Sequence, residues 1–115
     1  MWGACPMTDK LEKPVKYAND SAAITTSHTI RWVRVARTGK IYIANVTVKL
    51  TSNVAAWTTL FTLKDVTIAT SQYIYGNVNG TTAALFYIGT AGNVSGVSGF
   101  SNGDEIKIAI PLVLE

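Results

Sequence analysis

Apolar and polar residues alternate along two long stretches of the chain, at residues 40–50 and 105–114. Successive side chains of a β-strand point to opposite faces, so this alternation predicts two strands, each with one buried and one exposed face. The predicted buried rows are Tyr42, Ala44, Val46, Val48 and Leu50 in the first stretch, and Ile106, Ile108, Ile110, Leu112 and Leu114 in the second. Pro111 falls on the other face, and because proline lacks the N–H of a ladder hydrogen bond, it predicts an edge position or a bulge.

Four shorter stretches rich in β-branched and aromatic residues predict further strands, at residues 28–36, 58–63, 72–78 and 82–89. Thr38-Gly39 predicts a hairpin turn, and Asn79-Gly80 suits the two positive φ angles of a type I′ turn. Ala91-Gly92-Asn93 is also assigned to a turn. No window has the periodicity of an amphipathic helix. The expected fold is therefore an all-β, antiparallel β-sandwich over residues 28–115, while residues 1–27 are expected to be an arm or linker from a longer fibrous chain.

The stretch at residues 82–89 is apolar on both faces, with Ala84, Phe86 and Ile88 on one and Ala83, Leu85 and Tyr87 on the other. It lies within residues 66–103, which contain no charged side chain. Since no helices are predicted to cover a second apolar face, the pattern predicts that this face packs against a second subunit. An uncharged surface also suits a symmetric interface, where each charge would meet its own copies.

Composition excludes several classes of protein. No run of residues approaches the ~18 consecutive apolar residues of a membrane-spanning helix, so membrane insertion is not expected. The formal net charge of +3 is too small to indicate a nucleic-acid partner, and the cations of residues 31–49 are assigned to solvated strand faces. Cys5 is the only cysteine, so no intrachain disulfide can form. The first residues lack the features of a signal peptide, which predicts synthesis in the cytoplasm without export.

Catalytic signatures are missing from the sequence. His28 is the only histidine, and neither it nor Cys5 has a predicted orienting partner for nucleophilic catalysis or a zinc-ligand spacing. Asp65 with Asp104 or Glu105 is the one carboxylate pairing within the predicted β body, but each of these acids falls where a turn is expected. We therefore predict that the protein is not an enzyme and needs no metal or other cofactor.

The chain resembles the C-terminal knobs of tail fibre, baseplate and minor structural proteins from phages of Gram-positive hosts. The resemblance is carried by residues 33–39 and 41–50, by 53–63 with a Trp-Thr pair, by 77–85, and by the closing strand at 103–114. It departs from that pattern at Lys64-Asp65-Val66-Thr67, where many such knobs have a proline- and glycine-containing turn. The resemblance implies a jelly-roll-like sandwich that assembles as a homotrimer in the virion, joined to the rest of the phage tail, and attached to a host cell-surface saccharide.

Saccharides are bound by aromatic faces together with amides and hydroxyls, and the sequence offers several candidates. Tyr73 and Tyr75 share one predicted strand face, and Asn77 and Asn79 continue it into the hairpin. Packing between subunits is the alternative role for the tyrosines. Further candidates are Trp57, with a core or rim role as its alternative, and Trp32 beside two arginines, with a packed strand position as its alternative. The competing function is a purely structural trimerisation or capping knob without receptor contact.

Overall fold

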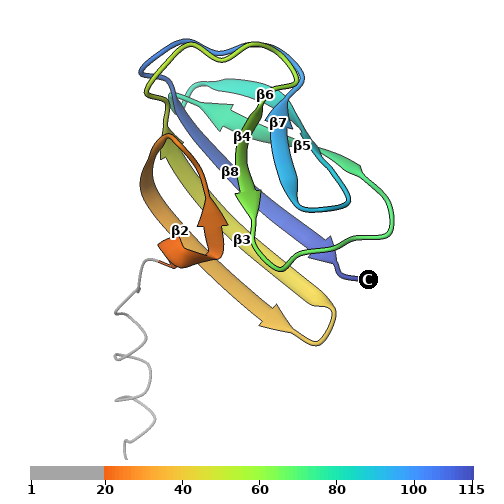
Figure 1. The fold of residues 1–115 in the computed structure, drawn as a ribbon. Helices are drawn as coiled ribbons and strands as arrows, with labels where there is room; N and C mark the ends of the chain where they lie inside the picture. The colour runs from red at the N-terminus through yellow and green to blue at the C-terminus, as the bar shows by residue number, and fades with distance from the viewer. Residues whose placement is uncertain (1–19) are drawn as a thin grey trace, which may run out of the picture.

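The computed structural model describes residues 20–115 and shows an all-β protein (Figure 1). Within these residues the only helix is the short 3-10 helix η2 (Ser21–Ala23). The expected all-β, antiparallel class is confirmed. The strands are β1 (Ile24–Thr25), β2 (Thr29–Thr38), β3 (Ile41–Lys49), β4 (Thr59–Leu63), β5 (Gln72–Val78), β6 (Thr82–Ile88), β7 (Asn93–Gly96) and β8 (Glu105–Val113).

All eight strands belong to one nearly closed, barrel-like sheet in the order β1-β4-β7-β6-β5-β8-β3-β2. The strands at the two ends of this order, β1 and β2, follow one another in the chain (Figure 1). Asp20 bonds the outer edge of β2: its N–H donates to the Val33 carbonyl at 2.7 Å, and its carboxylate accepts from the Val35 N–H at 2.9 Å. Part of an edge that could pair with another chain is therefore occupied within the same chain.

The two long alternating stretches form β3 and β8, which pair with each other along their full length. Every residue predicted for their buried rows is at most 5% exposed. The predicted positive φ angles of the hairpin after β5 are also present, 54° at Asn79 and 75° at Gly80. Local periodicity and turn chemistry therefore placed these strands correctly.

Two strands were not predicted. Ile24 and Thr25 were assigned to the N-terminal arm, yet they form β1, paired with Leu63 and Thr62 of β4. The boundary drawn at residue 28 therefore leaves out part of the sheet, whereas residues 1–19 of the predicted arm lie outside the described residues. The turn assigned at Ala91-Gly92-Asn93 runs directly into β7, whose short sequence has few strand-forming residues and is held between β4 and β6.

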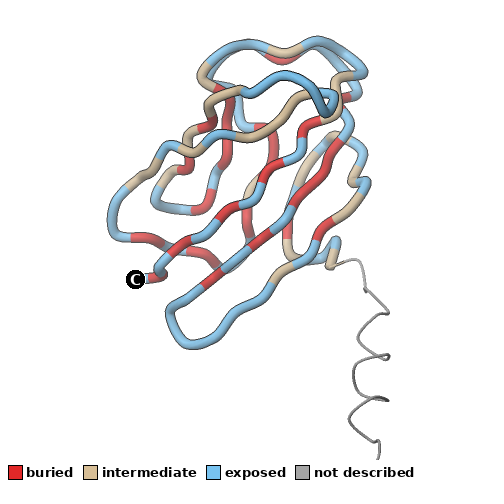
Figure 2. The backbone as a smooth tube through the Cα atoms, turned by 180° about the vertical axis from the view of Figure 1, so that it is seen from behind, coloured by how far each residue is buried: buried red, intermediate tan, exposed pale blue. Residues whose placement is uncertain are grey.

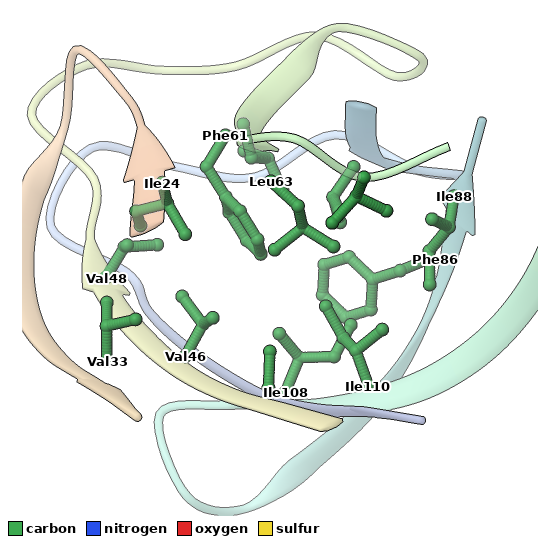
Figure 3. Packing of buried hydrophobic residues seen from close by; sticks show 14 of the residues in the cluster. Ile24, Val33, Val46, Val48, Phe61, Leu63, Phe86, Ile88, Ile108 and Ile110 are labelled. Atoms are coloured by element: carbon green, nitrogen blue, oxygen red, sulfur yellow. The ribbon is translucent and has the colours of Figure 1, made fainter. Parts of the chain in front are cut away.

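The core occupies the inside of the barrel-like sheet. Figure 2 shows buried and exposed positions alternating along the strands, as expected when one face of a sheet is covered. Figure 3 shows side chains from opposite parts of the sheet meeting in the interior, among them Val46, Phe61, Phe86 and Ile108. Phe86 also stacks on Phe100, with 5.6 Å between ring centroids.

Candidate functional site

The sheet opens between β5 and β8. These strands pair only at Asn77 with Lys107 and at Val78 with Ile106, whereas β5 pairs with β6, and β8 with β3, along their full lengths. Beyond Asn77 the two strands separate, and a groove of about 870 Å³ lies beside the separation. Ligand pockets in proteins typically measure ~300–1,000 Å³. This groove is therefore large enough to hold a small ligand.

A row of outward-facing residues that crosses five strands lines the groove. Trp32 of β2 lies opposite Thr47 of β3, which lies opposite Lys107 of β8. Lys107 in turn lies opposite Asn77 of β5, which lies opposite Ala83 of β6. All five residues line the groove. The sheet register thus brings together side chains that are up to 75 positions apart in the sequence.

Trp32 lies in this row because of the register of the hairpin formed by β2 and β3. That register runs without interruption from the turn between the two strands to Trp32, which lies opposite Thr47. It places Trp32 on the outer face, where Thr47 is only 8% exposed. A β-bulge lies next to it in the strand: the register shifts between Ile30 and Trp32, so Arg31 is an extra residue in β2. The bulge therefore turns Ile30 toward the core and leaves Trp32 facing the groove.

The aromatic surface of the groove comes from Trp32 and Tyr75, and polar groups lie between them. The Tyr75 side chain is 71% exposed, which leaves most of its ring accessible. The amide of Asn45 also lines the groove. The Oδ1 atom of Asn77 is buried and accepts no hydrogen bond from the described residues. The groove thus combines aromatic surface with amide, hydroxyl and ammonium groups.

Charge at the groove comes mainly from two residues of β8. Lys107 lies in the row described above, and Glu105 lies two residues before it on the same face. The Glu105 carboxylate is 3.8 Å from the Arg31 guanidinium, and both side chains are about half exposed to solvent. Such an exposed pair contributes little to stability, but it places opposite charges together at the rim.

The predicted candidates therefore separate into three places. Trp32, Tyr75 and Asn77 line the groove. Asn79 lies outside it, and both ends of its amide are engaged: Nδ2 donates to the Asp104 carboxylate at 3.0 Å, and Oδ1 accepts from the Glu105 N–H at 2.9 Å.

Trp57 and Tyr73 form a separate aromatic cluster. Both rings make edge-on contacts with Tyr87 of β6, at 5.8 and 5.3 Å between centroids. Tyr87 belongs to the second apolar face predicted for residues 82–89, so side chains of the same chain cover part of that face. Trp57 is still 55% exposed and Tyr73 58%, and the cluster is a surface rather than a hollow.

Sequence reasoning did not find Asn45, Thr47 and Lys107 as part of the site. Each appears in the sequence as an ordinary polar residue on the exposed face of an alternating strand. Only the register of four neighbouring strands shows that they adjoin Trp32 and Asn77. No signal within one strand would have separated them from other exposed polar residues.

The remaining candidates for chemistry have structural surroundings. The ring nitrogen Nδ1 of His28 accepts from the Thr51 N–H at 3.2 Å, and Asp104 accepts from the Ser101 N–H at 2.9 Å. Asp65 lies in the turn after β4, with φ at 56°. Among residues 20–115 there is no cluster of three or more potential metal ligands. In the same part of the chain, no helix has the length and apolar character needed to cross a membrane.

Comparison with known proteins finds no matching family model, no matching curated protein and no matching solved structure.

Proposed function

We propose that the protein is a non-catalytic saccharide-binding module that holds its ligand in the groove between β5 and β8. The observation that carries this proposal is the meeting of Trp32 and Tyr75 with the amides of Asn45 and Asn77 in one hollow of about 870 Å³. Aromatic rings offer apolar faces to the C–H groups of a sugar, while amides and hydroxyls bond its hydroxyl groups.

The biological setting that we propose is the receptor-binding tip of a phage tail fibre or baseplate, attached to a host cell-surface polysaccharide. This setting depends on the sequence resemblance, which also implies a jelly-roll-like sandwich and a homotrimer within the virion. The short pairing between β5 and β8 supports the proposed sandwich. Only two residue pairs join the group of five strands that ends at β5 to the group of three strands that begins at β8.

The test is binding of the purified protein to a glycan array and to wall polysaccharide from Gram-positive bacteria. Trp32→Ala and Tyr75→Ala are expected to weaken binding at least tenfold, because each removes one aromatic surface of the groove. Tyr73→Ala is the matched control: Tyr73 is an exposed tyrosine of the same strand that does not line the groove. Equal losses in all three variants, or no binding by the unmodified protein, would contradict the proposal.

A structural knob without receptor contact is the second candidate function. It is favoured by exposed apolar side chains away from the groove, namely the cluster of Trp57 and Tyr73 and a patch formed by Ile41, Ile43 and Val113. Mass in solution tests it. A stable trimer that Trp57→Ala converts to monomers, together with absent glycan binding, would favour this candidate.

A further inference from the structure

The separation of β5 and β8 leaves backbone groups unpaired as well as side chains exposed. Antiparallel strands exchange hydrogen bonds at every second residue pair. Asn79 N–H donates to the Glu105 carbonyl at 2.8 Å, so this pair and Asn77 with Lys107 are the bonding pairs of the β5–β8 ladder. The next bonding pair in the same register would be Tyr75 with Ala109. It is not formed.

The pairing of β8 with β3 gives the same direction for the backbone groups of Ala109. Leu50 N–H donates to the Asp104 carbonyl, and Leu114 N–H donates to the Lys40 carbonyl, so even-numbered residues of β8 direct their backbone groups toward β3. The uninterrupted β3–β8 register then directs the backbone groups of Ala109 and the other odd-numbered residues toward β5. Since Tyr75 and Ala109 both line the groove, each presents one N–H and one C=O toward it.

We propose that the groove selects saccharides bearing a 2-acetamido group, whose amide occupies the place of the missing Tyr75–Ala109 pair. This inference rests on the proposed saccharide-binding function. An acetamido group carries one N–H donor and one C=O acceptor, as a peptide does, and so complements the unpaired backbone of a strand. A plain hydroxyl sugar lacks an amide with this arrangement.

An extended peptide would also complement a free strand edge, but β8 limits its addition. The next residue of β8 after Ala109 with its backbone directed toward the β5 side is Pro111, which has no N–H to donate. A peptide strand would therefore lose a bond at the next step, whereas a single acetamido group requires only one pair of backbone groups. The aromatic surfaces of Trp32 and Tyr75 also suit a sugar ring beside the amide.

The test compares diacetylchitobiose with cellobiose, two disaccharides that differ in their acetamido groups. Diacetylchitobiose is expected to bind at least tenfold more tightly in calorimetric titration and to shift the backbone amide NMR signals of Tyr75 and Ala109. Ala109→Pro removes a groove-facing N–H without removing a bond to β3, and it should abolish the preference. Val113→Pro makes the same change on the same side of β8 at a residue that does not line the groove, and it should leave the preference intact.

Equal binding of the two disaccharides, or binding of wall polysaccharide but of neither disaccharide, would overturn the acetamido inference and leave saccharide binding standing. Binding of no saccharide at all would overturn both proposals. Tighter binding of an alanine–glycine pentapeptide than of diacetylchitobiose would overturn the acetamido inference and indicate that the groove binds a peptide. If Ala109→Pro does not fold, the amide shifts of the unmodified protein still decide the question.

Discussion

Gly76 lies where β5 comes close to Phe86 and to the backbone of β8, and replacing it with alanine should destabilise the protein. A Cβ atom at Gly76 would lie 2.7 Å from Cε2 of Phe86 and 3.0 Å from the Lys107 carbonyl oxygen. The Phe86 ring is fully buried and stacked on Phe100, so it has no solvent-filled space to move into. The methyl group would therefore displace a core ring or push β8 away from β5.

The expected cost of Gly76→Ala is about 1–3 kcal/mol in the free energy of unfolding, the usual range for an overpacked core. Gly89 provides the matched control. A Cβ there would meet its nearest atoms at 3.7 and 3.8 Å, which is ordinary contact, and its φ angle lies outside the left-handed region. Gly89→Ala should stabilise the protein by about 0.4–1 kcal/mol, because alanine restricts the unfolded chain more than glycine does.

Urea unfolding followed by tryptophan fluorescence would measure both variants against the unmodified protein. The two midpoints should move in opposite directions. Equal stability of Gly76→Ala and Gly89→Ala would refute the reasoning, because it would show that Phe86 and β8 can yield to the methyl group at no cost.

Two further predictions concern polar groups away from the core contacts of Gly76. The Tyr42 hydroxyl is buried without a hydrogen-bond partner among residues 20–115, so Tyr42→Phe should raise the free energy of unfolding by ~1 kcal/mol in urea titrations. Burial raises the Tyr42 pKa above 10.0, with Asp20 adding to and Arg37 opposing the effect, so the unfolded chain loses this proton first. The unmodified protein should therefore lose stability relative to Tyr42→Phe as pH rises above 10, and a constant difference would contradict this. Asn79→Ala should lower the urea midpoint more than Asn79→Gly does. Both variants lose the hydrogen bonds to Asp104 and Glu105, but only alanine is strained at a φ of 54°. Equal midpoints of the two variants would contradict this prediction.

Periodicity predicted the strands well wherever burial is one-sided. The prediction for residues 72–78 coincides with β5, and the prediction for 40–50 differs from β3 by one residue at each end. The prediction missed β1 and β7, because these short strands form through pairing with their neighbours and not through a strand-like composition. Val94 of β7 is fully buried, yet its neighbours Asn93, Ser95 and Gly96 are typical of turns.

The candidate site was predicted only in part. The predicted face of β5 contributes Tyr75 and Asn77 to the groove. Alternation in β2 places Trp32 on the face of Arg34, opposite that of Val33, but it does not show which residues of other strands lie beside it. The unpaired backbone groups of Ala109 also could not be predicted, because the residues of a strand do not show where the neighbouring strand separates from it.

The sequence by itself determined the all-β class, the rows that face the core and the positive φ angles of the hairpin, because these depend on interactions between near neighbours in the chain. Tertiary structure decided the barrel-like order of the strands, the bulge that turns Ile30 toward the core and the separation of β5 from β8. These features depend on register between strands that are far apart in sequence, and register is fixed by packing of the whole core. The groove exists only at that level.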